Sequence, residues 1–279
     1  MSHAVTVAGP KRARRDQAAA ALIAAATGAM LWRVPVAAGW PGLIGSVGAA
    51  QALLVVCWMA GLALPGKIGT LLLGDGAAVA ADVAVLTRHQ ASLAPLAGVI
   101  AVAFLVMLLH QLCRGVVRVR MTASVSGVAM LVVADCGLAA LLVLHRVDRG
   151  TPVVSAAVLA MAAALVVANL VDLLAPVARF DDDVAAGPAA PLLAAIAGAT
   201  AAIWRLHGVS DFGVIGGAVF GGLLGLCCGL LAVAAAYVAV SARPRKAPFT
   251  WLAVPALRVL VPLAMTTPVA YLLGQLVLW

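Results

Sequence analysis

The sequence predicts an all-α fold, a polytopic bundle of about nine transmembrane helices, and three observations predict it. Apolar residues make up 65% of the 279 residues, whereas a soluble domain is about half apolar. Charged residues make up only 10%, and the mean hydropathy is +1.14. The apolar residues also form long runs, and a bilayer core of about 30 Å is crossed by about 20 such residues in a helix. A water-soluble fold and simple disorder are both excluded, because each needs far more polar sequence.

Proline, glycine, arginine and aspartate residues divide the apolar sequence into candidate spans. The loops between the spans are short, and none could hold a soluble domain. We therefore expect a basic cytoplasmic tail, 1–16, followed by a single transmembrane domain, 17–279. The predicted spans are 17–32, 42–64, 69–87, 92–113, 122–144, 152–176, 188–204, 212–241 and 252–278.

The first span follows a basic segment, the same order as in a signal peptide. A cleaved signal and a retained span both fit this pattern. We favour a retained span because eight further candidate spans follow, and cleavage would leave the remaining topology unchanged.

The span 69–87 is the doubtful one because it contains Asp75 and Asp82. If it crosses the membrane, 12 of the 18 basic residues lie on the N-terminal side and 5 on the other, with Arg258 inside the last span. Without it, the counts are 9 and 8. Positive charge is concentrated in cytoplasmic loops, so the charges favour nine spans, a cytoplasmic N-terminus and an external C-terminus.

We expect the protein in the cell (inner or plasma) membrane. The preference for arginine, alanine, valine and glycine is typical of a bacterial genome rich in G and C, which suggests the bacterial envelope.

A basic run follows span 92–113. It is a candidate for contact with lipid headgroups, because arginines next to a span attract anionic lipids. The expected partner is therefore the lipid bilayer with its anionic headgroups, and not nucleic acid, since the basic residues lie at the ends of apolar runs. The candidate residues are Arg114, Arg118 and Arg120.

Ionisable residues at membrane depth form two predicted groups, since a charge in hydrocarbon is costly and usually functional or paired. The rise of about 1.5 Å per helical residue places Asp82 and Asp135 about 20 Å from the inner ends of their spans. Two carboxylates in one dry site do not both ionise readily, so this pair is a candidate proton or cation relay. The alternative is that each bonds locally to backbone, serine, threonine or glutamine. Residues nearer the inner leaflet are candidates for an ion-pair cluster: Asp75, Asp172 and Arg258. Asp75 also lies between two glycines, where a local helix break is possible.

Span 212–241 carries glycines four residues apart, which share one face of a helix. Small residues let transmembrane helices approach closely, so this stripe predicts tight helix packing, inside the chain or with a second subunit. We expect Gly221→Leu to be disruptive and alanine to be tolerated. The packing candidates are Gly213, Gly217, Gly221, Gly225 and Gly229. In the last span, Pro255, Pro262 and Pro268 predict a bent helix.

No sequence motif indicates catalysis, so we expect no catalytic residues, no metal and no cofactor. The sequence has no H-E-x-x-H, Walker or G-x-S-x-G motif, and the five cysteines are interpreted as packing residues.

Three functional hypotheses remain. The first, which we favour because the polar residues are few and can be explained by packing, is a non-catalytic scaffold or assembly subunit of a bacterial envelope complex, which contacts other subunits or itself through the glycine face. The second is a small proton-coupled transporter that uses Asp82 and Asp135. The third is an envelope-lipid enzyme, for which the acidic triplet 181–183 is the only candidate. A transporter predicts a solvated cavity at the two carboxyls, and a scaffold predicts carboxyls that are dry and locally bonded.

Overall fold

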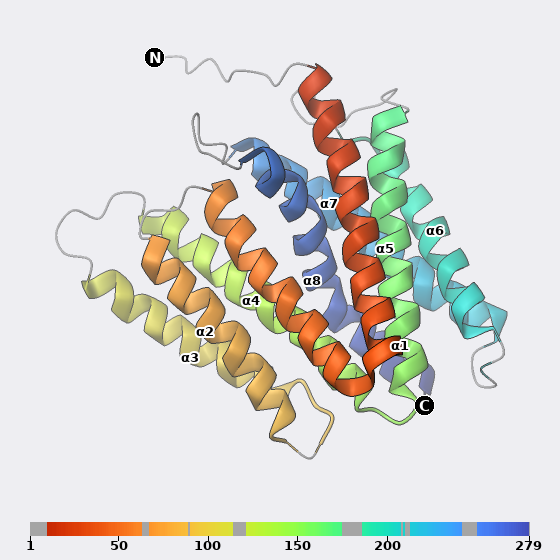
Figure 1. Cartoon of the computed structure of the whole chain (residues 1–279), viewed down its shortest axis with the longest axis horizontal. Coiled ribbons are helices and arrows are strands. Elements are labelled where there is room, and N and C mark those ends of the chain that lie inside the picture. The colour runs from red at the N-terminus through yellow and green to blue at the C-terminus, as the bar shows by residue number, and fades with distance from the viewer. Residues whose placement is uncertain are drawn as a thin grey trace.

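The computed structural model describes residues 10–62, 67–88, 90–113, 121–174, 186–207, 209, 213–241 and 250–278. Within these ranges the chain forms eight helices and no strand (Figure 1), which confirms the all-α prediction. All eight are long and apolar enough to cross a membrane, so the fold is that of a membrane-embedded protein. The helices are α1 (Pro10–Leu62), α2 (Lys67–Leu86), α3 (Ala94–Cys113), α4 (Met121–His145), α5 (Gly150–Leu174), α6 (Ala189–Leu206), α7 (Val214–Ser241) and α8 (Thr250–Leu278).

Helices α2 to α8 match the predicted spans from 69–87 onward, with ends that differ by a few residues. The doubtful span is therefore a full apolar helix of 20 residues. The helix also continues through Gly74, Asp75 and Gly76, so the predicted local break there is wrong. Continuous helical hydrogen bonding is expected in lipid, because no water is present to satisfy open backbone groups.

Helix α1 includes the first two predicted spans, and its path changes at Gly39. This residue has φ 63° and ψ −143°, a conformation outside the helical region that is essentially restricted to glycine. Figure 1 shows the two legs of α1, 10–38 and 40–62, meeting there in a V. The helix begins at Pro10, so the last part of the predicted tail is helical, and Asp16 and Gln17 are buried.

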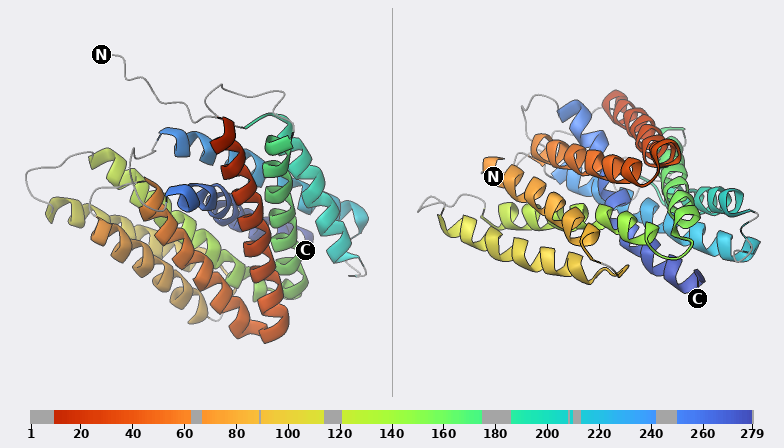
Figure 2. Two further views of the ribbon diagram at one scale, coloured as in Figure 1. Left: turned by 45° about the horizontal axis from the view of Figure 1, so that its top comes forward. Right: turned by 60° about the horizontal axis from the view of Figure 1, so that its bottom comes forward.

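The most buried spans are α4 and α8, which form the centre of the bundle together with α1 and α5. Their interior faces carry large aliphatic side chains that are fully buried, such as Leu138 and Leu142 on α4 and Leu260 on α8. In Figures 1 and 2, α3 lies at one edge of the bundle and α6 at the opposite edge. The start of α1 and the end of α8 lie at opposite ends of the bundle in Figure 1.

The glycine stripe of α7 packs against α6. A Cβ added at Gly217 would meet the backbone of Ile203 at 3.4 Å, and one at Gly229 would meet the Cα of Pro191 at 2.6 Å. At Gly221 it would meet the carbonyl of Gly198, so the expectation that alanine is tolerated there is wrong. Gly225 lies against the backbone of α6 in the same way, whereas Gly213 has open space around it. Two backbones thus approach each other where both helices carry small residues.

Helix α8 remains one helix through its three prolines. Pro268 has no N–H, so the carbonyl of Ala264, four residues earlier, loses its usual donor. The Thr267 hydroxyl donates to that carbonyl at 2.7 Å, and it also contacts the backbone carbonyl of Gly137 on α4. The Thr266 hydroxyl donates to the carbonyl of Pro262 at 2.7 Å. The Thr267 side chain therefore satisfies a carbonyl that Pro268 leaves without its backbone donor, as is common in membrane helices.

Candidate functional site

A polar site lies where the second leg of α1 meets α2 and α4, and Gln51 is its centre. The Nε2 atom of Gln51 donates one hydrogen bond to Oδ1 of Asp82 on α2, at 3.2 Å. It donates a second to the backbone carbonyl of Asp135 on α4, at 3.0 Å. Gln51 is 1% exposed and Asp135 is 0% exposed. A single buried amide therefore joins three segments of the chain.

The carboxyl of Asp135 is completely buried. Both of its oxygens are without a hydrogen-bond partner among the described residues. A buried, ionised carboxylate without a partner costs several kcal/mol, about as much as breaking a buried ion pair. The position therefore suits a carboxyl that carries a proton, or one that shares a cation.

Asp75 and Asp82 are seven residues apart on α2, which places both on the face toward Asp135. Both are half-buried. Among the described residues, no salt bridge joins any of the three to a basic side chain. The site is thus a group of three carboxyls with one buried amide, and it is acidic throughout.

The three carboxyls do not all lie at the same depth along the helices. Asp82 is four residues from the end of α2 at Leu86, about 6 Å along the axis. Asp135 is ten residues from the end of α4 at His145, about 15 Å. Asp75 is eleven residues from Leu86, about 17 Å along the axis, which is close to the depth of Asp135. Asp82 therefore lies nearest to this face of the bundle, and Asp135 and Asp75 lie deeper, at similar depths.

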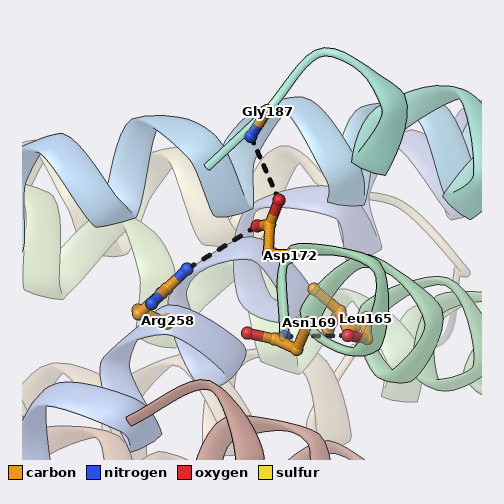
Figure 3. A network of polar contacts seen from close by, with 5 residues as sticks. All are labelled: Leu165, Asn169, Asp172, Gly187 and Arg258. Carbon is orange, nitrogen blue, oxygen red and sulfur yellow. Dashed lines mark hydrogen bonds and ion pairs between the residues drawn. The ribbon is translucent and has the colours of Figure 1, made fainter. Parts of the chain in front are cut away.

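A second polar group joins α5, α8 and the segment before α6 (Figure 3). A guanidinium nitrogen of Arg258 lies 4.0 Å from Oδ2 of Asp172, and the two side chains are 8% and 9% exposed. The other oxygen of Asp172 accepts a hydrogen bond from the backbone N–H of Gly187 at 3.0 Å. On the same face, Asn169 donates to the carbonyl of Leu165 within its own helix. This pair of opposite charges is arranged to hold three segments together.

Asp75 does not join this pair, which corrects the predicted inner-leaflet cluster. Helix α2 packs against α1, α3 and α4, whereas Asp172 and Arg258 lie on α5 and α8. Counting residues along a helix gives the depth of a side chain but not its neighbours, so depth alone grouped Asp75 with the wrong partners.

A groove of about 1250 Å³ lies between α2 and α3. It uses the face of α2 that carries Ala80 and Ala84, and neither Asp82 nor Asp135 lines it. The solvated cavity that a transporter predicts at those carboxyls is therefore not part of this groove.

Several predicted residues lie outside the described part of the chain. They are Arg114, Arg118, Arg120 and the triplet 181–183. Among the residues that are described, no three His, Cys, Asp or Glu side chains come together as a metal site.

One contact near the site could not be predicted from the sequence. The guanidinium of Arg146, in the turn after α4, donates to the backbone carbonyls of Val85 and Arg88 at the end of α2. These carbonyls have no partner within the helix. No sequence pattern indicated this contact, because it depends on the packing of α2 beside α4.

Comparisons of the chain with family models, curated proteins and solved structures give no match. The functional argument therefore depends on the geometry of the site.

Proposed function

We propose that the protein is a small proton-coupled transporter of the cell membrane, in which Asp82, Asp135 and Asp75 carry the proton. The observation that carries this proposal is the Asp135 carboxyl, fully buried on α4 with no hydrogen-bond partner among the described residues. Two further carboxyls, Asp75 and Asp82, share one face of α2, the helix that packs against α4.

The arrangement suits reversible protonation better than permanent charge. Complete burial of a carboxyl without a partner disfavours its charged form, so Asp135 suits a role in which it binds and releases a proton. Asp82 is half-buried near the end of α2 and receives protons from that side. Gln51 holds Asp82 beside the turn of α4 that carries Asp135. The proton then moves from Asp82 to Asp135 and on to Asp75.

The proposal includes nine membrane crossings, with the N-terminus cytoplasmic and the C-terminus external. The apolar part of α1 is 49 residues long, about 74 Å if it were straight, against a hydrocarbon core of about 30 Å. The V at Gly39 lets its two legs cross separately. The distribution of basic residues in the sequence favours this orientation, in a bacterial cell membrane.

The scaffold hypothesis is less well supported. It uses the glycine face of α7 as a contact for other subunits, and α6 of the same chain covers that face. It also expects dry, locally bonded carboxyls: Asp135 is dry and Asp82 accepts a bond from Gln51, but Asp135 has no hydrogen-bond partner among the described residues.

Proton uptake by the reconstituted protein tests the proposal. We would place the purified protein in liposomes that contain a pH-sensitive dye and apply an inward-negative membrane potential. We expect wild-type protein to acidify the lumen, and Asp135→Asn and Asp82→Asn to slow this at least tenfold. The control is Asp148→Asn, which changes an exposed carboxyl in the turn after α4. Equal rates in wild type and in both variants would overturn the proposal.

A further inference from the structure

The α2–α3 groove combines an apolar floor with a polar end. Small residues on both helices, among them Gly76 and Ala80 on α2 and Gly98 on α3, leave room between the helices. Larger apolar side chains, such as Leu72 and Val102, line its length. Thr87, Arg88, Gln90 and Ser92 line the end where α2 leads into α3. The groove is thus apolar along its length and polar at one end, which matches an amphiphile with an apolar chain and a polar headgroup.

We propose that this groove binds one anionic phospholipid, with an acyl chain along the floor and the phosphate at Arg88. This inference holds whether or not the carboxyl site carries protons. It adds a ligand site on the opposite face of α2.

Charge complementarity identifies the headgroup. Among the described residues that line the groove, Arg88 alone carries a charge. The described residues form no salt bridge to its guanidinium. A guanidinium binds a phosphate by two parallel hydrogen bonds, a geometry that a neutral headgroup does not match. The Arg146 guanidinium, bound to the Arg88 carbonyl, brings a second positive charge to the same segment.

The length of the groove fits an acyl chain. Leu72 and Ala84 both line it and are twelve residues apart on α2, about 18 Å along the helix. Half of the hydrocarbon core is about 15 Å thick. A chain anchored at Arg88 therefore lies along the groove to the middle of the bilayer. Helix α3 is the least buried span, so the groove is open for a lipid to enter from the side.

Two glycines allow the groove to be filled without damage to the fold. A Cβ added at Gly98 or at Gly76 meets nothing within 4 Å, so a leucine at either position extends into the groove. Leucine also has a higher helix propensity than glycine. Gly48 on α1 has the same open space but lies outside the groove, so Gly48→Leu is the matched control.

The test measures binding of dioleoylphosphatidylglycerol and of dioleoylglycerol, which lacks the phosphate, by native mass spectrometry of the protein in detergent. We expect wild type to hold one phosphatidylglycerol at least tenfold more tightly than dioleoylglycerol. Arg88→Gln should remove this preference, whereas Arg33→Gln, an exposed arginine on α1, should keep it. Gly98→Leu should weaken both lipids at least tenfold, and Gly76→Leu provides the same test if Gly98→Leu has a lower melting temperature.

Two results would overturn the inference. Unchanged binding in Gly98→Leu and Gly76→Leu, each with a melting temperature equal to that of Gly48→Leu, would show that the lipid is not in the groove. Equal affinity of wild type for both lipids would show that Arg88 does not recognise the phosphate.

Discussion

At the residue scale, one amide organises the acidic site. Gln51 uses its two N–H groups on two different helices, one bond to a side chain and one to a backbone carbonyl. The amide donates to the Asp82 carboxyl and leaves the Asp135 carboxyl unbonded. The two aspartates, which look alike in the sequence, therefore have different environments. In the transporter that we propose, Asp82 exchanges protons with the surface and Asp135 stores one.

Replacing Gln51 should loosen the site. Gln51→Leu removes both inter-helix bonds, and such bonds in membranes contribute about 0.6 kcal/mol on average and at most about 1.7. We expect the free energy of unfolding in detergent to fall by about 1 kcal/mol. Gln51→Glu should cost more at pH 8 than at pH 5, because an ionised fourth carboxyl repels the Asp82 carboxyl. Stability of both variants that is independent of pH and equal to wild type would contradict this role.

Substitutions in the buried pair of Asp172 and Arg258 should change stability in a different way from substitutions of Gln51. Asp172→Leu leaves the Arg258 guanidinium buried without its carboxylate, which in soluble proteins costs about 3–5 kcal/mol. The double variant Asp172→Leu/Arg258→Met removes both charges, and we expect it to regain most of the lost stability. Chemical unfolding in mixed micelles measures the three proteins. A double variant as unstable as the sum of the two single variants would show that the charges do not act as a pair.

At the element scale, glycines perform two distinct tasks. Gly39 allows a backbone conformation at the V of α1, and open space surrounds its missing Cβ. Gly221 is in ordinary helix, and its task is to let α6 approach. The same residue type therefore serves once for its torsion angles and once for its size. Replacing Gly39 or Gly221 by alanine tests each task separately.

Gly39→Ala tests the first task. Its methyl group meets no atom within 4 Å, so any cost arises from the positive φ, about 1–3 kcal/mol. Gly45→Ala, at a helical glycine of α1 with equal open space, should be neutral or stabilising by up to about 1 kcal/mol. Thermal unfolding in detergent measures both. Equal melting temperatures would mean that the V does not depend on the backbone of Gly39.

Gly221→Ala tests the second task. The added methyl group would overlap the Gly198 carbonyl and the Ala202 side chain, so α6 and α7 must move apart. We expect a loss of about 1–3 kcal/mol, the usual cost of overpacking. Gly222→Ala is the neighbouring control, because its Cβ would lie at an ordinary 3.7 Å from the Ala199 Cβ. Equal stability of the two variants would contradict the packing role of the stripe.

The sequence predicted the helices well because their ends coincide with loops rich in proline, glycine and charge. It could not predict which helices are neighbours. Gln51, Asp82 and Asp135 were all visible as polar residues in apolar spans, but the hydrogen bonds of Gln51 appear only when α1, α2 and α4 are packed. Asp75 was grouped with Arg258 because the two residues have similar depths, and the sequence does not show that α2 packs against α1, α3 and α4. In an apolar sequence with little periodic pattern, the position of a residue along its helix predicts its depth in the membrane. It does not predict which residues of other helices lie next to it.

At the scale of the whole molecule, the V of α1 determines how many times the chain can cross the membrane. If both legs cross the bilayer, the exposed residue Ala37 beside Gly39 faces the outside. The native Cys113 is exposed at the last residue of α3, two further crossings past the second leg, and therefore faces the cytoplasm. The other cysteines are buried or half-buried.

This threading predicts opposite accessibility for two thiols. In Ala37→Cys/Cys113→Ser, a membrane-impermeant maleimide should react in right-side-out vesicles and not in inside-out vesicles. In the wild type, Cys113 should react only in inside-out vesicles, because α2 and α3 together return the chain to the side where the second leg of α1 ends. The Cys113→Ser protein gives the background from the other thiols. Reaction of both thiols from the same side would mean that α1 does not cross twice. The depths of Gln51, Asp82 and Asp135 in the membrane would then differ from those proposed, because Gln51 lies on the second leg of α1 and bonds to both α2 and α4.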